Sequence, residues 1–103
     1  MMKKLVLAAA AALALAAPAR ADLSVFACEP EWGALATELA GSAAAVTTAT
    51  TALQDVHMIE AKPSLVAKMR RADLVVCSGA DLEVVWLPQL VRQSGNPKIA
   101  SGA

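Results

Sequence analysis

The 103-residue chain has few of the side chains on which catalytic and nucleic-acid-binding sites depend. It contains one histidine, two cysteines, two tryptophans, one phenylalanine and no tyrosine. Its basic residues form no patch interleaved with aromatics, so the electrostatic footprint of a nucleic-acid-binding protein is missing. The two cysteines lie far apart in the sequence, which excludes a Cys-x-x-Cys redox motif. No glycine-rich phosphate loop follows a predicted strand.

Long hydrophobic runs are also scarce, and the one that exists lies at the N-terminus. Residues 1–4 form a short basic segment, and residues 5–17 form an uninterrupted apolar segment. This run is too short for a membrane-spanning helix, which needs roughly 20 residues. Pro18 ends the run, and Ala19-Arg20-Ala21 has the small-x-small pattern that signal peptidase cleaves. We therefore predict a signal peptide at residues 1–21, removed after Ala21, which sends the chain to the periplasm.

The remaining residues 22–103 carry more acidic than basic side chains and have the composition of an ordinary globular protein. A domain of this size buries a small core and is marginal in stability. The segment 96–100 looks like the beginning of another strand, followed by only three residues. We therefore expect residues 22–103 to be one incomplete lobe of a truncated product.

Hydrophobic periodicity predicts alternating strands and helices along residues 22–103. The predicted strands are residues 23–28, 44–49 and 73–77. The predicted helices are residues 30–41, a second beginning at Pro63, and residues 81–95 with Asp81 as N-cap and a kink at Pro88. Trp32 and Trp86 lie on apolar helical faces and are expected in the core. The alternation predicts an α/β fold with a short parallel sheet flanked by helices.

Three chemically distinctive side chains follow the predicted strands. Cys28 follows the first strand, His57 lies in the loop after the second, and Cys77 closes the third. In open α/β sheets, ligands bind beyond the carboxyl ends of the strands. Imidazole is the commonest protein ligand for transition metals, yet a lone loop histidine is more often simply solvated. Composition and spacing therefore do not establish a metal site.

A resemblance to a known family gives His57 a more specific interpretation. The chain resembles the substrate-binding proteins of zinc- and manganese-type ABC transporters. The resemblance rests on Asp55-Val56-His57 followed by Pro63-Ser64, on Ala72-Asp73-Leu74-Val75-Val76, and on Gly79-Ala80-Asp81-Leu82-Glu83. The opening Val25-Phe26-Ala27-Cys28-Glu29-Pro30-Glu31-Trp32 looks like one proteobacterial branch of that family. Val56 replaces the proline that usually precedes the histidine, and Met58 stands where some relatives have a second histidine.

The resemblance implies a periplasmic protein, acting as a monomer, that captures Zn²⁺, or Mn²⁺ as the less favoured metal, and delivers it to a membrane permease. It implies that His57 is the first metal ligand and that the remaining ligands come from later parts of such proteins. Asp55 and Glu60 are expected as a loop-capping residue and a solvated charge. A sharper alternative is a carboxylate that orients the second ring nitrogen of His57.

The sequence leaves several alternatives open. Because the periplasm is oxidising, Cys28 and Cys77 are expected to form a disulfide if the first and third strands are neighbours. Buried free thiols and soft metal ligands remain alternatives for both. For the whole chain, the alternatives to metal capture are a small exported thiol, redox or enzymatic module and an inert truncated fragment. Our prediction is a binding protein and not an enzyme.

Overall fold

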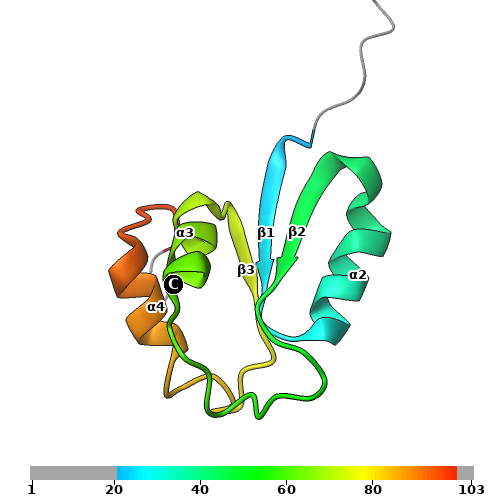
Figure 1. Ribbon diagram of the computed structural model, residues 1–103. Helices are drawn as coiled ribbons and strands as arrows, with labels where there is room; N and C mark the ends of the chain where they lie inside the picture. The colour runs from blue at the N-terminus through cyan, green and yellow to red at the C-terminus, as the bar shows by residue number, and fades with distance from the viewer. Residues whose placement is uncertain (1–20, 100–103) are drawn as a thin grey trace, which may run out of the picture.

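The computed structural model describes residues 21–99, which form a three-stranded parallel sheet with helices on both faces (Figure 1). The strands are β1 (Leu23–Ala27), β2 (Ala44–Thr48) and β3 (Leu74–Val76), in the order β2-β1-β3. The predicted α/β class and parallel sheet are therefore confirmed. The predicted signal peptide falls almost entirely outside the described residues.

The three helices each begin at or next to a proline, whose missing N–H costs nothing in the first turn. They are α2 (Pro30–Ala40), α3 (Pro63–Arg71) and α4 (Leu87–Ser94), and a single 3₁₀ turn, Gly41–Ala43, joins α2 to β2. Within residues 21–99, none of the helices is long and apolar enough to cross a membrane.

The sheet order determines where the helices and the loops lie. The connection from β1 to β2 and the connection from β2 to β3 run in opposite directions across the sheet. Because such connections are right-handed, α2 covers one face and α3 covers the other, as Figure 1 shows. The parallel register pairs Val25 of β1 with Val46 and with Leu74. All three strands therefore end at one edge of the sheet, where the loops after β1, β2 and β3 meet.

The core lies between the sheet and the helix pair α3 and α4. Its buried members are Phe26, Cys28, Met69, Ala72, Trp86 and Leu90. Polar contacts fasten the outer end of this layer, where the Asn96 side chain donates to the carbonyl oxygens of Met69 and Ala72 at 2.9 and 2.7 Å. These bonds give side-chain donors to carbonyls at the end of α3, of which the Met69 carbonyl also accepts the N–H of Ala72.

The predicted helix at residues 81–95 is wrong in its first half. Residues 80–86 are turns and bends, the φ angles of Ala80 and Asp81 are +53° and +66°, and the helix begins only at Leu87. Asp81 is therefore not an N-cap, and Pro88 lies in the first turn of α4 and causes no kink. Val84 and Val85, expected on an apolar helical face, are exposed. The spacing of Val84 and Val85 fits an apolar helical face, but the backbone at these residues is not helical.

Two further expectations need correction. The segment predicted to start a fourth strand forms a turn over Asn96–Ile99, in which the N–H of Ile99 donates to the carbonyl of Asn96. The prediction for tryptophan holds for Trp86, which is fully buried, but not for Trp32. Trp32 is half-buried beside the sheet, and its indole N–H donates to the hydroxyl of Ser78 at 2.7 Å.

Candidate metal-binding site

The loop between β2 and α3, residues 49–62, carries His57 across the carboxyl edge of the sheet. Its beginning is fixed by two hydrogen bonds, from the N–H of Ala49 to the carbonyl of Ala27 and from the Thr50 hydroxyl to the carbonyl of Cys28. Its middle is fixed by the indole N–H of Trp86, which donates to the carbonyl of Val56 at 2.7 Å. The backbone next to His57 is therefore anchored to the core, although its side chain is not.

Asp55 orients His57 in two ways. Its Oδ1 accepts the backbone N–H of His57 at 3.0 Å and lies 2.8 Å from the ring Nδ1. The first contact is the loop-capping role predicted for Asp55, and the second is the sharper alternative of a carboxylate that orients the ring. Both roles are present together. The hydrogen bonds from the backbone and then the ring of His57 lower the pKa of Asp55, so this carboxyl group stays ionised near neutral pH.

The geometry leaves one ring nitrogen for a ligand. An ionised Asp55 is only an acceptor, so the Nδ1 that faces it carries the proton, and Nε2 then presents its lone pair. The His57 side chain is 57% exposed, and Nε2 is not among the hydrogen-bonded atoms of residues 21–99. A carboxylate behind an imidazole is the usual arrangement behind a metal-binding histidine. Glu60 is exposed, as expected for a solvated charge.

The described residues give His57 no further ligands. Over residues 21–99, only one group of three metal-binding side chains has its ligand atoms close together, and His57 is not in it. Zinc in proteins takes about four donors. The structure therefore places one oriented imidazole at the carboxyl edge and not a complete site, and the role of His57 as a ligand stays a prediction.

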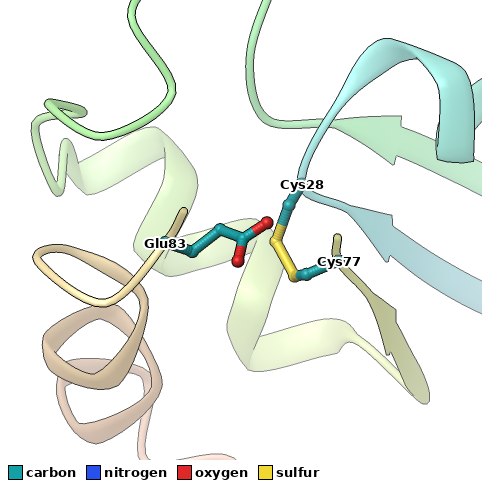
Figure 2. Close-up of side chains that lie close together, drawn as sticks. All are labelled: Cys28, Cys77 and Glu83. Atoms are coloured by element: carbon teal, nitrogen blue, oxygen red, sulfur yellow. A yellow bond between two sulfur atoms is a disulfide. The ribbon is translucent and has the colours of Figure 1, made fainter. Parts of the chain in front are cut away.

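The other two predicted residues, Cys28 and Cys77, meet at the same edge. Their sulfur atoms are bonded to each other and their Cα atoms are 4.9 Å apart, within the usual range of about 4.4–6.8 Å (Figure 2). Cys28 is fully buried and Cys77 is half-buried. The close approach follows from the β2-β1-β3 order, since β1 and β3 are neighbours and each cysteine follows its strand directly.

Two buried carboxyl groups, which the sequence did not single out, lie at this edge: a carboxylate oxygen of Glu83 is within 4.8 Å of both sulfur atoms, and Glu29 directly follows Cys28. Glu83 accepts the backbone N–H groups of Ser78 and Gly79 at 3.0 and 3.1 Å, and Glu29 lies 3.4 Å from the same N–H of Ser78. Each glutamate is only 4% exposed. Figure 2 shows the carboxyl group of Glu83 directed at the two sulfur atoms. We call this group the disulfide–carboxyl cluster; its members are Cys28, Cys77, Glu29 and Glu83.

The surroundings of Glu29 in this cluster favour its protonated form. Burial, followed by the hydrogen bond with Glu83 and the negative charge of Glu83, raises the pKa of Glu29 to about 7. The Oε1 atom of Glu29 is buried and has no hydrogen-bond partner among the described residues. The available sequence signal was the position of Glu29, directly after a buried strand. The approach of Glu83 depends on the turn at residues 80–86, which the helical pattern concealed.

Comparison with known proteins defines the family. A model of the family described as zinc-uptake complex component A, periplasmic, matches residues 25–103. No curated protein sequence matches the chain. A solved periplasmic metal-binding protein from Candidatus Liberibacter asiaticus has the same fold, with a TM-score of 0.63 and 24% identity over 73% of this chain and 27% of that chain.

The manganese-bound and cadmium-bound structures from that organism each give a TM-score of 0.62 and the same identity of 24%, over 73% of this chain and 27% of those chains. The present chain thus spans about a quarter of the length of these structures. The family match covers most of the chain, including β2, β3 and all of β1 except its first two residues. The chain belongs to the family of periplasmic zinc-uptake components.

Proposed function

We propose that this chain contributes the first ligand of a site that captures a divalent transition metal in the periplasm for an ABC importer. The metal is the transported cargo, and it is passed on to a membrane permease. Zinc is the preferred ion because imidazole suits it well, and manganese is the alternative. Residues 1–21 act as a cleavable signal peptide for export. The chain acts as a monomer and carries out no catalytic step.

The observation that supports this proposal most directly is the Asp55–His57 pair. Asp55 holds both the backbone and Nδ1 of His57, so the ring is oriented before any metal arrives. The hydrogen bond to an ionised carboxylate also makes the opposite nitrogen a better donor. The family match and the metal-bound structural neighbours agree with this role.

The mechanism that follows is reversible coordination without covalent chemistry. Nε2 of His57 exchanges a water molecule for the metal, and Asp55 keeps the ring in place. The anchors at Thr50 and Trp86 hold the loop against the core, so the imidazole stays at the carboxyl edge of the sheet. Release is fast because one donor gives weak affinity, whereas closed structural zinc sites reach about 10–16 kcal/mol.

Titration calorimetry with Zn²⁺ on the oxidised chain tests the proposal. One imidazole predicts a dissociation constant in the micromolar range or weaker, which His57→Ala abolishes. Asp55→Asn, which keeps the side-chain size but removes the charge behind the ring, should weaken binding about 10-fold. Glu60→Gln is the matched control, since Glu60 is an exposed carboxylate of the same loop and should leave the binding unchanged. Zinc binding of unaltered strength in His57→Ala would contradict the proposal.

A further inference from the structure

An apolar groove lies on the face of the sheet that α2 covers. It is formed by residues of α2, β1 and β3, has a volume of about 240 Å³, and every described residue in its lining is apolar. Four leucines of the lining, Leu23, Leu35, Leu39 and Leu74, are 39–78% exposed. A contiguous exposed apolar surface marks a binding site more often than scattered apolar side chains do. An apolar cavity of about 150 Å³ holds a benzene-sized group, so the apolar groove has room for one or two leucine side chains.

The N-terminal apolar segment, residues 5–17, is joined to the chain at one end of this groove. β1 starts at Leu23, which lines the groove, and the N–H of Asp22 donates to the carbonyl of Ala43 at 3.2 Å. Figure 1 shows that β1 begins at the end of the sheet where α2 ends. Residues 18–22 make the connection, and five residues reach at most about 17 Å. The apolar segment is therefore held within reach of the apolar groove.

The length and the charge of this segment also match α2. The 13 residues from 5 to 17 would form a helix about 20 Å long, and the 11 residues of α2 extend over about 16 Å. A turn at Pro18 would lay the segment along the groove, with Lys3 and Lys4 near the start of α2. Glu31 lies in the first turn of α2, and α2 contains no basic residue. The lysines and Glu31 attract each other in this arrangement.

We propose that residues 5–17 occupy the apolar groove in the uncleaved chain and that cleavage after Ala21 opens it. Leu13 and Leu15, the leucines nearest to the connection, fill the groove beside α2. The inference rests on the signal peptide of the proposed function and does not depend on metal capture. It gives residues 1–21 a second role, because they cover apolar surface until the chain is exported and leave that surface open in the mature chain.

Acrylamide quenching of tryptophan fluorescence tests this proposal, because Trp32 lines the apolar groove whereas Trp86 is buried. The protein is the full chain with residues 1–21 uncleaved and the disulfide formed. We expect Trp32 to be shielded in this chain. Leu13→Glu should raise the quenching constant roughly 2-fold, since the loss of one buried leucine shifts a docking equilibrium about 10-fold or more.

Leu39→Glu and Ala34→Glu form a matched pair on α2. Both positions are exposed and both gain one charge, but only Leu39 lines the apolar groove. Leu39→Glu should therefore expose Trp32 as Leu13→Glu does, and Ala34→Glu should leave it shielded. Far-UV circular dichroism follows the fold of each variant, and Leu39→Gln replaces Leu39→Glu if the charged variant unfolds.

Three results would overturn the proposal. The first is equal quenching in the parent and in Leu13→Glu, and the second is an equal effect of Leu39→Glu and Ala34→Glu. The third is loss of the shielding on ten-fold dilution, because the groove would then be occupied by another copy and not by the segment of the same chain.

Failure of the proposed function is measured separately. Zinc calorimetry with His57→Ala reports on metal capture and involves no residue of the apolar groove. The mass of the exported chain reports whether residues 1–21 are removed. Their retention would contradict both the signal peptide and the opening of the groove, while quenching of the uncleaved chain would still decide whether the segment docks.

Discussion

The two faces of the sheet are covered very differently. On one face, α3 and α4 pack over a continuous core in which Phe26, Met69 and Leu90 are fully buried. On the other face, α2 lies over β1 and β2 (Figure 1). The apolar groove is lined there by residues of α2, β1 and β3. Leu35, Leu39 and other groove residues stay exposed, with Leu39 at 78%.

This difference shows where the free energy of folding comes from. Apolar area removed from water contributes about 25 cal/mol per Å², so a leucine at the α4 face stabilises the chain and an exposed leucine does not. The disulfide and the hydrogen bonds from Asn96 to the end of α3 also lie on the side of the sheet that α3 and α4 cover. We therefore expect large stability effects from changes on that face and small ones from changes in α2. The predictions below test this contrast.

Removing the disulfide should have the largest effect. In the chain-entropy model, a bond that closes a loop of about 50 residues stabilises by roughly 4 kcal/mol. The double variant Cys28→Ala/Cys77→Ala should lose about that much in chemical denaturation, a large share for a domain this small. Alkylation and mass spectrometry of unreduced periplasmic protein provide the check on the bond itself. Two alkylatable thiols there would show that the cysteines are free, and the loss of stability would then need another cause.

Leu90→Ala should cost about 3 kcal/mol. Leu90 is fully buried against the core between the sheet and α3, and truncation of a buried leucine removes transfer energy and leaves a cavity. Urea unfolding followed by circular dichroism measures the loss. A cost below about 1 kcal/mol would mean that α4 contributes little to the folded state and would remove the contrast between the two faces.

The sequence predicts most of the fold because strands and helices here follow local patterns. The run Leu74–Val76 is apolar and contains two β-branched valines, and Pro30 and Pro63 mark where α2 and α3 begin. The prediction failed at residues 81–86, because Val84 and Val85 continue an apolar spacing without being buried. The structure of this segment depends instead on contacts distant in sequence and on Glu83 binding the N–H groups of Ser78 and Gly79. The spacing of apolar residues along the sequence cannot predict such contacts.

The candidate site was predictable to a similar degree. Its members could be placed at the ends of strands, since the βαβ order brings Cys28, His57 and Cys77 to one edge. The contact between Asp55 and His57 was one of two stated alternatives, because residues two apart in a turn can bond through the side chain. The pairing of Glu29 with Glu83 could not be foreseen, since it requires the exact path of the turn before α4.

The titration of Glu29 should make the free energy of unfolding depend on pH. Burial and Glu83 raise the pKa of Glu29 from 4.5 to about 7, and nearby Glu31 adds to this effect. A raised pKa in the folded state gives stability that is complete below pH 4.5 and is lost as the pH rises through 7. We expect the free energy of unfolding to fall by roughly 3 kcal/mol over this window, because each tenfold difference in proton affinity between the folded and unfolded states is worth about 1.4 kcal/mol.

Glu29→Gln should remove this dependence, whereas Glu38→Gln, at an exposed position of α2, should retain it. Urea unfolding at half-unit pH intervals compares the three proteins. Equal pH slopes in the parent and in Glu29→Gln would show that Glu29 titrates normally in the folded state.

Leu39→Ala should have the smallest effect, below about 0.5 kcal/mol, because the side chain is 78% exposed before truncation. The same chemical change costs several times more at Leu90, so the pair of variants isolates burial from residue type. The measurement is urea unfolding at two protein concentrations, ten-fold apart. A cost above about 1 kcal/mol that grows with concentration would mean that another copy covers α2 in solution. The two faces would then differ in what covers them and not in whether they are covered.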